Sequence, residues 1–138
     1  MKNNLEVYID TNFYLRFVFN DIPKQNQKCR SLIESAKSGR CDLHLTEETI
    51  CEIVYVLLKL YKLNRKEIKE DLSFFLSHKF VRNENKRVVF LALEIFLGTN
   101  LSIVDSVLVS KASFHGRALA TFDEDLLKVS KAYKVPIV

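Results

Sequence analysis

The sequence has little of what marks a disulfide-rich protein or a flexible linker. Its 138 residues include no tryptophan, two prolines, three glycines and three cysteines. So few prolines and glycines leave little room for a disordered connection between domains. The cysteines, Cys29, Cys41 and Cys51, are odd in number and show no CxxC or Cys/His pattern, so we expect neither a disulfide framework nor a zinc site. We interpret them as reduced thiols and expect a cytoplasmic protein.

Long apolar runs are also missing. Lys59 and Glu94 interrupt the longest ones, which fall short of the roughly 18 residues that a membrane span needs. The N-terminal residues 1–6 lack the apolar core of a signal peptide. We therefore expect no membrane partner.

What is present suits one globular domain over residues 1–138. The apolar fraction of 48% is ordinary for a protein with a core, and 21 Lys and Arg against 17 Asp and Glu give a net charge of +4. This mild basicity allows a polyanionic partner such as nucleic acid without demanding one. An acidic pocket within a basic rim is the pattern of a metal-dependent nuclease, although charge alone is explained more simply by an ordinary mixed surface.

Short apolar runs alternate with amphipathic segments along the chain. We expect strands at residues 5–9, 43–45, 80–81 and 118–121, with a terminal extended piece at 135–138. Helices are expected at residues 11–19, 24–38, 46–62, 65–77, 84–97, 102–114 and 123–132. Short apolar strands alternating with helices are typical of a parallel sheet covered on both faces, so the predicted fold class is α/β.

Two acids directly follow predicted strands. Asp10 comes after the first strand and Asp123 after the strand at 118–121. Each suits a helix N-cap, as do Thr11 and Asn12, and each also suits the carboxyl edge of a sheet, where open α/β sheets bind ligands. The position of Asp10 alone does not separate these two compatible interpretations. Asp125 is an alternative to Asp123, although we favour it as an exposed first-turn residue.

Two further acids interrupt apolar helices. Asp105 shares a helix face with Leu108, Val109 and Ala112, so we expect its carboxylate to face the interior or a cleft and to need a cation or hydrogen-bond donors. A buried Asp that holds a neighbouring helix is the structural alternative. Glu52 is weaker, because a solvated glutamate near Lys59 is unremarkable and nothing local selects it over its acidic neighbours.

Four motifs taken together resemble the PIN domain, in particular a VapC-type toxin ribonuclease. The motifs are Tyr8-Ile9-Asp10-Thr11-Asn12, the helix 50–57 around Glu52, Ser102-Ile103-Val104-Asp105-Ser106-Val107-Leu108, and Leu119-Ala120-Thr121-Phe122-Asp123. The resemblance covers nearly the whole chain. It implies a three-layer α/β/α sandwich around a central parallel sheet.

The resemblance also implies the site. Its catalytic and metal-binding residues are Asp10, Glu52, Asp105 and Asp123, and Thr11, Asn12 and Thr121 support them with hydrogen bonds. Carboxylate oxygens suit Mg²⁺ or Mn²⁺, which would activate a water to hydrolyse an RNA phosphodiester bond. The expected partners are an RNA substrate, a second copy in a homodimer and a small antitoxin protein. Candidate contacts to the RNA backbone are Lys24, Lys28, Arg30, Arg40, Lys59, Lys62, Arg65 and Arg117.

Three rival interpretations remain open. A PIN-like nuclease of RNA processing would use the same chemistry. A non-catalytic RNA-binding or scaffold protein with this fold would fail to bind Mn²⁺. A phosphatase of another α/β family would usually carry an Asp-x-Asp pattern after the first strand, where this chain has Asp10-Thr11-Asn12.

Overall fold

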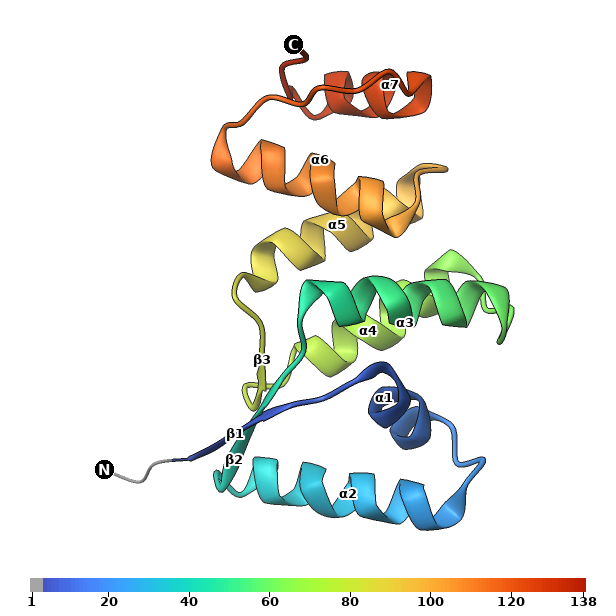
Figure 1. The fold of residues 1–138 in the computed structure, drawn as a ribbon, viewed down its shortest axis with the longest axis vertical. Coiled ribbons are helices and arrows are strands. Elements are labelled where there is room, and N and C mark those ends of the chain that lie inside the picture. The colour runs from blue at the N-terminus through green and yellow to red at the C-terminus, as the bar shows by residue number, and fades with distance from the viewer. Residues whose placement is uncertain (1–3) are drawn as a thin grey trace.

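The computed structural model describes residues 4–138, so the first three residues of the predicted domain lie outside it (Figure 1). The described residues form three strands, β1 (Leu5–Tyr8), β2 (Cys41–His44) and β3 (Val81–Arg82). They form seven helices, α1 (Thr11–Val18), α2 (Pro23–Lys37), α3 (Glu47–Lys59), α4 (Arg65–Leu76), α5 (Lys86–Gly98), α6 (Ile103–His115) and α7 (Glu124–Ala132). Within residues 4–138, no helix is long and apolar enough to cross a membrane.

Polar side chains fix where most of the helices begin. In every described helix except α2, the side chain just before the helix accepts a hydrogen bond from a backbone N–H of the first turn, which satisfies a donor that the helix itself cannot pair. These capping residues are Asp10, Thr46, Asn64, Asn85, Ser102 and Asp123. Gly116 ends α6 with φ of 64°, a left-handed conformation that glycine adopts without strain. Local side chains therefore fix where α1, α6 and α7 begin, and three of the predicted acids, Asp10, Asp105 and Asp123, lie at these helix starts.

The three strands form a parallel sheet in the order β1-β2-β3. Leu5 pairs with Cys41 and Tyr8 with His44 in register, and Leu43 pairs with Val81. In Figure 1, α1 and α2 lie on one side of the sheet, and α3 and α4 lie on the other. The predicted α/β class, with helices on both faces of a parallel sheet, is confirmed.

The buried apolar side chains form two clusters. The larger cluster surrounds the sheet and includes Leu43, Ile53 and Leu72, each with no exposed surface. The smaller cluster joins α5 and α6 to the C-terminal part of the chain through Ile95, Leu101, Val109, Ala112, Leu126 and Val135. Each cluster excludes water from its own part of the molecule, so the C-terminal residues are held on α5 and α6 rather than on the sheet.

The predicted strand at residues 118–121 is the main departure. It is reduced to one parallel bridge between Leu119 and Ile137, outside the three-stranded sheet. The helix predicted at 84–97 begins later, at Lys86, because Asn85 accepts hydrogen bonds from the N–H groups of Arg87 and Val88. The first change follows from the packing of the second cluster, which no local pattern reports.

Arg65 ties α4 to the turn between α5 and α6. Its Nη1 donates to the carbonyl oxygens of Phe96 and Leu101 at 2.7 Å each, and its guanidinium lies 4.1 Å from the centre of the Phe96 ring. Weaker contacts reach the carbonyls of Thr99 and Asn100. This guanidinium satisfies carbonyls at and just beyond the end of α5, so it has a structural role, while its place among the candidate RNA contacts stays a prediction.

We expect Arg65→Lys to lower the free energy of unfolding by about 1–3 kcal/mol, because a lysine ammonium cannot reproduce the planar fork that reaches several carbonyls. Urea unfolding followed by circular dichroism measures the change. The matched control is Arg87→Lys, an exposed arginine of α5, which should change stability little. Equal effects of the two substitutions would contradict this role for Arg65.

Tyr14 carries a buried hydroxyl without a hydrogen-bond partner. The side chain is 1% exposed, and its ring packs edge-on against Phe75 at 5.3 Å between centroids. Its hydroxyl oxygen makes no hydrogen bond to any described residue. Burial, and then the charge of Asp71, raise the pKa of Tyr14 well above its ordinary value. Folding therefore opposes ionisation of this phenol.

We expect Tyr14→Phe to raise stability by about 1 kcal/mol at neutral pH, because it removes an unsatisfied buried polar group. Since the folded pKa is raised, the wild type should lose stability as the pH rises above about 10, the pKa in the unfolded chain, and the variant should not lose it. Urea unfolding at pH 7 and pH 11 tests both points, with the exposed Tyr55→Phe as control. A destabilised variant at pH 7 would show that the hydroxyl has a partner.

Candidate functional site

Asp10 lies directly beyond the carboxyl end of β1 and begins α1. Its Oδ1 accepts a hydrogen bond of 2.8 Å from the backbone N–H of Phe13, and the residue is exposed. The helix-cap interpretation of Asp10 is therefore confirmed. The interpretation as a metal ligand stays open, because the cap uses only Oδ1 and the carboxylate has a second oxygen that can bind a ligand.

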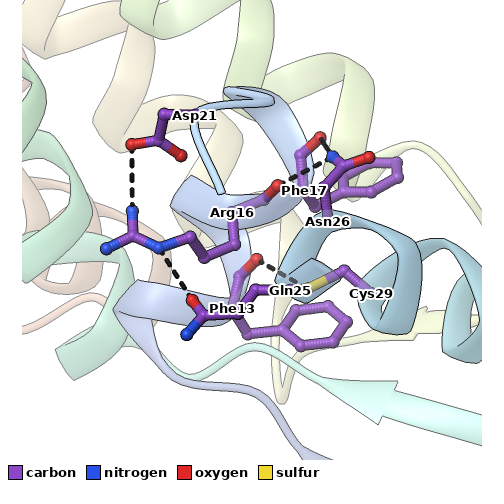
Figure 2. A network of polar contacts seen from close by, with 7 residues as sticks. All are labelled: Phe13, Arg16, Phe17, Asp21, Gln25, Asn26 and Cys29. Atoms are coloured by element: carbon purple, nitrogen blue, oxygen red, sulfur yellow. Dashed lines mark hydrogen bonds and ion pairs between the residues drawn. The ribbon is translucent and has the colours of Figure 1, made fainter. Parts of the chain in front are cut away.

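A polar network fixes the helix pair next to Asp10 (Figure 2). Arg16 of α1 donates from Nε to Gln25 Oε1 at 3.0 Å and from Nη1 to Asp21 Oδ2 at 3.3 Å. The side-chain amide of Asn26, 4% exposed, donates to the carbonyls of Arg16 and Phe17 at the end of α1. These contacts hold α1 against α2 and so fix the position of Asp10 at the start of α1.

A cavity of about 630 Å³ lies between α1 and α2. Asp10, Asn12 and the cation of Lys28 line it, together with Cys29. Burial and the charge of Asp10 raise the pKa of the Cys29 thiol, so the sulfur stays protonated and is a poor nucleophile. The chemistry offered by this cavity is a carboxylate beside a cation, not a thiolate.

Asp123 opens α7 at the other end of the molecule. Its Oδ1 accepts from the N–H of Leu126 at 2.9 Å, and its own N–H donates to Thr121 Oγ1 at 3.0 Å. Thr121 thus orients the backbone at Asp123. Asp125 is exposed in the first turn of α7, as we predicted for it.

Asp105 and Glu52 lie on different helices. Asp105 is half-buried in the first turn of α6, and its N–H donates to Ser102 Oγ at 3.1 Å. Glu52 is exposed on α3. The ion pair between these two helices joins Lys111 of α6 to Glu47 of α3, with 2.6 Å between Nζ and Oε2. Neither Asp105 nor Glu52 takes part in it.

The four acids do not converge in this arrangement. Among residues 4–138, no three Asp, Glu, His or Cys side chains lie close enough together to hold a metal ion. Asp10 follows β1 and caps α1, whereas Asp123 caps α7, whose Leu126 belongs to the second cluster, and Figure 1 places α1 and α7 far apart. The donor types suit a hard divalent cation, but the placement does not fit one.

Two residues beside Asp10 were predicted to support the site. Thr11 is buried, and its Oγ1 makes no hydrogen bond within the described chain, while Asn12 is exposed beside the cavity. Because a buried hydroxyl without a partner is costly, Thr11 is a donor that a nearby ligand or carboxylate could use. Its supporting role stays a prediction.

A second polar pocket, of about 310 Å³, was not predicted. It lies at the carboxyl ends of the strands, where Tyr8, His44 and Arg82 are the last residues of β1, β2 and β3. Glu47 and Lys111 also line it. In the sequence, Tyr8 and His44 lie within the strands expected at 5–9 and 43–45, and Arg82 directly follows the strand expected at 80–81. The pairing of Glu47 with Lys111 joins two helices and could not be read from the sequence.

Comparison with known proteins identifies the family. The sequence model of the PIN domain matches residues 7–132. The chain therefore belongs to the PIN domain family, and the predicted resemblance and fold are confirmed. No curated protein matches the sequence.

One solved structure similar to this chain is described as the crystal structure of FitAcB from Neisseria gonorrhoeae. The sequence identity is 18%, the match covers 96% of each chain, and the TM-score is 0.33. The family assignment rests on the family match and not on this likeness. PIN domains are generally nucleases that use divalent metals, which supports a nuclease role here.

We expect Asp10→Asn to keep the stability of the wild type within a few tenths of a kcal/mol, because Asn caps a helix as well as Asp does. Asp10→Ala should lose about 1 kcal/mol, since the N–H of Phe13 then has no acceptor. Thermal unfolding of the two variants measures the difference. Equal losses in both would contradict the capping role and would make Asp10→Asn unsuitable as a probe of chemistry.

Proposed function

We propose that this PIN domain is a metal-dependent endoribonuclease that hydrolyses RNA phosphodiester bonds and acts as the toxin of a toxin–antitoxin pair. The observation that carries the proposal is the family match over residues 7–132, which contains all four predicted acids, Asp10, Glu52, Asp105 and Asp123. A scaffold protein that had given up catalysis would not need to keep all four.

Charge near Asp10 supports a polyanionic substrate. Lys28 lines the same cavity as Asp10, so a phosphate could be attracted by the ammonium while the carboxylate stays within reach of the scissile bond. The exposed position of Asp10 leaves it open to a ligand as large as RNA. Asp10 is therefore the acid on which we expect activity to depend most.

The proposed cofactor is Mg²⁺ or Mn²⁺, held by Asp10, Glu52, Asp105 and Asp123. As they are placed within residues 4–138, these acids do not fit the ion. A three-ligand site needs two further acids near Asp10, which the proposal draws from Glu52, Asp105 and Asp123.

The proposed protein partners are a second copy of the chain and a small antitoxin. Large apolar side chains are exposed on and beside α3 and α4, at Tyr55, Leu60 and Phe74, and suit the apolar face of an antitoxin segment. We propose a cytoplasmic location, with which three free cysteines agree.

The test is cleavage of a labelled RNA mixture by wild type and by Asp10→Asn, each with Mn²⁺ and with EDTA. We expect cleavage by the wild type with Mn²⁺ alone, and a loss of at least about 100-fold in the variant, because removing a ligand should cost no less than removing its support. Glu94→Gln, a change of an exposed acid on α5, is the control and should cleave as the wild type does.

Equal cleavage by Asp10→Asn would contradict the assignment of Asp10 and would indicate a contaminating nuclease. A folded wild type that cleaves no RNA and binds no Mn²⁺ would favour the non-catalytic RNA-binding alternative instead.

A further inference from the structure

A third cavity, of about 290 Å³, shares no lining residue with the cavity at Asp10 or with the polar pocket at the strand ends. Helices α1, α2 and α4 and the segment between α4 and β3 all contribute to its walls. Tyr14, which is 1% exposed, lies at its floor, whereas Asp71 and Phe74 are exposed at its rim. Its volume is near the lower end of the range for small-molecule sites.

Aromatic rings make up most of the wall of this cavity. Tyr14 packs edge-on against Phe75, and the ring centres of His78 and Phe80 lie 5.1 Å apart. The faces of such rings carry partial negative charge, so they attract a cation as well as apolar groups. The aromatic side chains that line the cavity are Tyr14, Phe17, Phe74, Phe75, His78 and Phe80.

The hydroxyl of Tyr14 is the polar group at the floor. It is buried, and it makes no hydrogen bond to any residue in the range 4–138. A buried hydroxyl without a partner is costly, and such a group calls for an explanation, of which a bound ligand is one. A molecule inside the cavity can supply the partner that the described chain lacks.

Asp71 supplies charge beside this hydroxyl. The charge of Asp71 raises the pKa of Tyr14, so the carboxyl group and the phenol lie near each other. Asp71 takes part in none of the ion pairs found among residues 4–138. Burial, and then the charges of Glu67 and Glu70, raise the pKa of Asp71. A cation bound at the rim would relieve this repulsion between acids.

The other two polar side chains of the cavity do not call for an anion. Lys37 is exposed, and its Nζ lies 3.4 Å from Oε1 of Glu34 on the same helix, so its charge already has a partner. Nδ1 of His78 lies 3.2 Å from the carbonyl oxygen of Phe75. Because a carbonyl only accepts, Nδ1 carries the hydrogen, and Nε2 of the neutral ring is a further acceptor. The polar groups of this cavity therefore favour a ligand that donates hydrogen bonds.

We propose that this cavity binds a small organic cation, whose ammonium group lies between Asp71 and the hydroxyl of Tyr14. The ammonium donates hydrogen bonds to the carboxylate and to the phenol oxygen, while the apolar body of the ligand packs against the phenylalanine rings. The site is independent of the proposed nuclease activity, since none of the four predicted acids lines it.

The test compares three molecules of nearly the same shape by isothermal titration calorimetry. Phenethylamine is the cation, phenethyl alcohol is neutral, and hydrocinnamate is an anion that could instead pair with Lys37. We expect the amine to bind at least about 10-fold more tightly than the alcohol, as one hydrogen bond to a charged group supplies. Equal affinities of amine and alcohol, tighter binding of hydrocinnamate, or no binding of the amine overturns the proposal.

The role of Asp71 is tested by Asp71→Asn, a change at an exposed position that should leave the fold intact. We expect its affinity for phenethylamine to fall to about that for phenethyl alcohol, because the charge that distinguishes the two ligands is gone. The matched control is Glu70→Gln, an exposed acid of α4 that does not line the cavity, and it should bind the amine as the wild type does. Unchanged binding by Asp71→Asn overturns the proposal.

The hydroxyl is tested by thermal unfolding of wild type and Tyr14→Phe at increasing phenethylamine concentration. A ligand raises the melting temperature in proportion to how well the folded protein binds it. We expect the amine to stabilise the wild type more than the variant, because only the wild type has the phenol oxygen. Equal increases in the melting temperature of both proteins overturn the contact with Tyr14.

Discussion

The packing of the C-terminal segment on α5 and α6 is the constraint on which the arrangement of this molecule depends. Leu126 and Val135 complete a small apolar cluster with Ile95 and Val109, and this cluster is separate from the core around the sheet. Burial of such side chains contributes about 1.5–3 kcal/mol each, enough for a few of them to decide where a short segment lies. Because the segment carries Asp123, the same packing decides which acids can meet within one chain.

The two acids that follow extended segments lie in different parts of the molecule. The first half of the chain presents Asp10 at the carboxyl end of a parallel sheet, at a cavity that Lys28 also lines, and the last part presents Asp123 beyond a strand-like segment. The packing that places the C-terminal segment on α5 and α6 therefore keeps these two acids apart.

Much of the fold could be predicted from the sequence, since helix caps and apolar periodicity are local. Asp10, Thr46, Ser102 and Asp123 cap the helices that their positions indicated, and β1 and β2 lie within a residue or two of their predicted ranges. The placement of residues 118–121 could not be predicted, because their apolar pattern fits a strand but does not show which segment pairs with it. The pattern selected Asp105 but not Glu52, which sits exposed among other acids and entered only by resemblance. The carbonyl contacts of Arg65 were also out of reach, because they join residues some 31 to 36 positions apart.

The most direct measurement is Mn²⁺ binding, followed by electron paramagnetic resonance, to wild type and to Asp10→Asn at equal protein concentration. The ion reports the proposed site without any RNA, and asparagine keeps the cap of α1 while it removes the carboxylate charge. We predict that the folded wild type binds Mn²⁺ and that the folded variant loses most of this affinity. Undiminished binding by Asp10→Asn would show that Asp10 is not a ligand, and would contradict the proposed role of this acid.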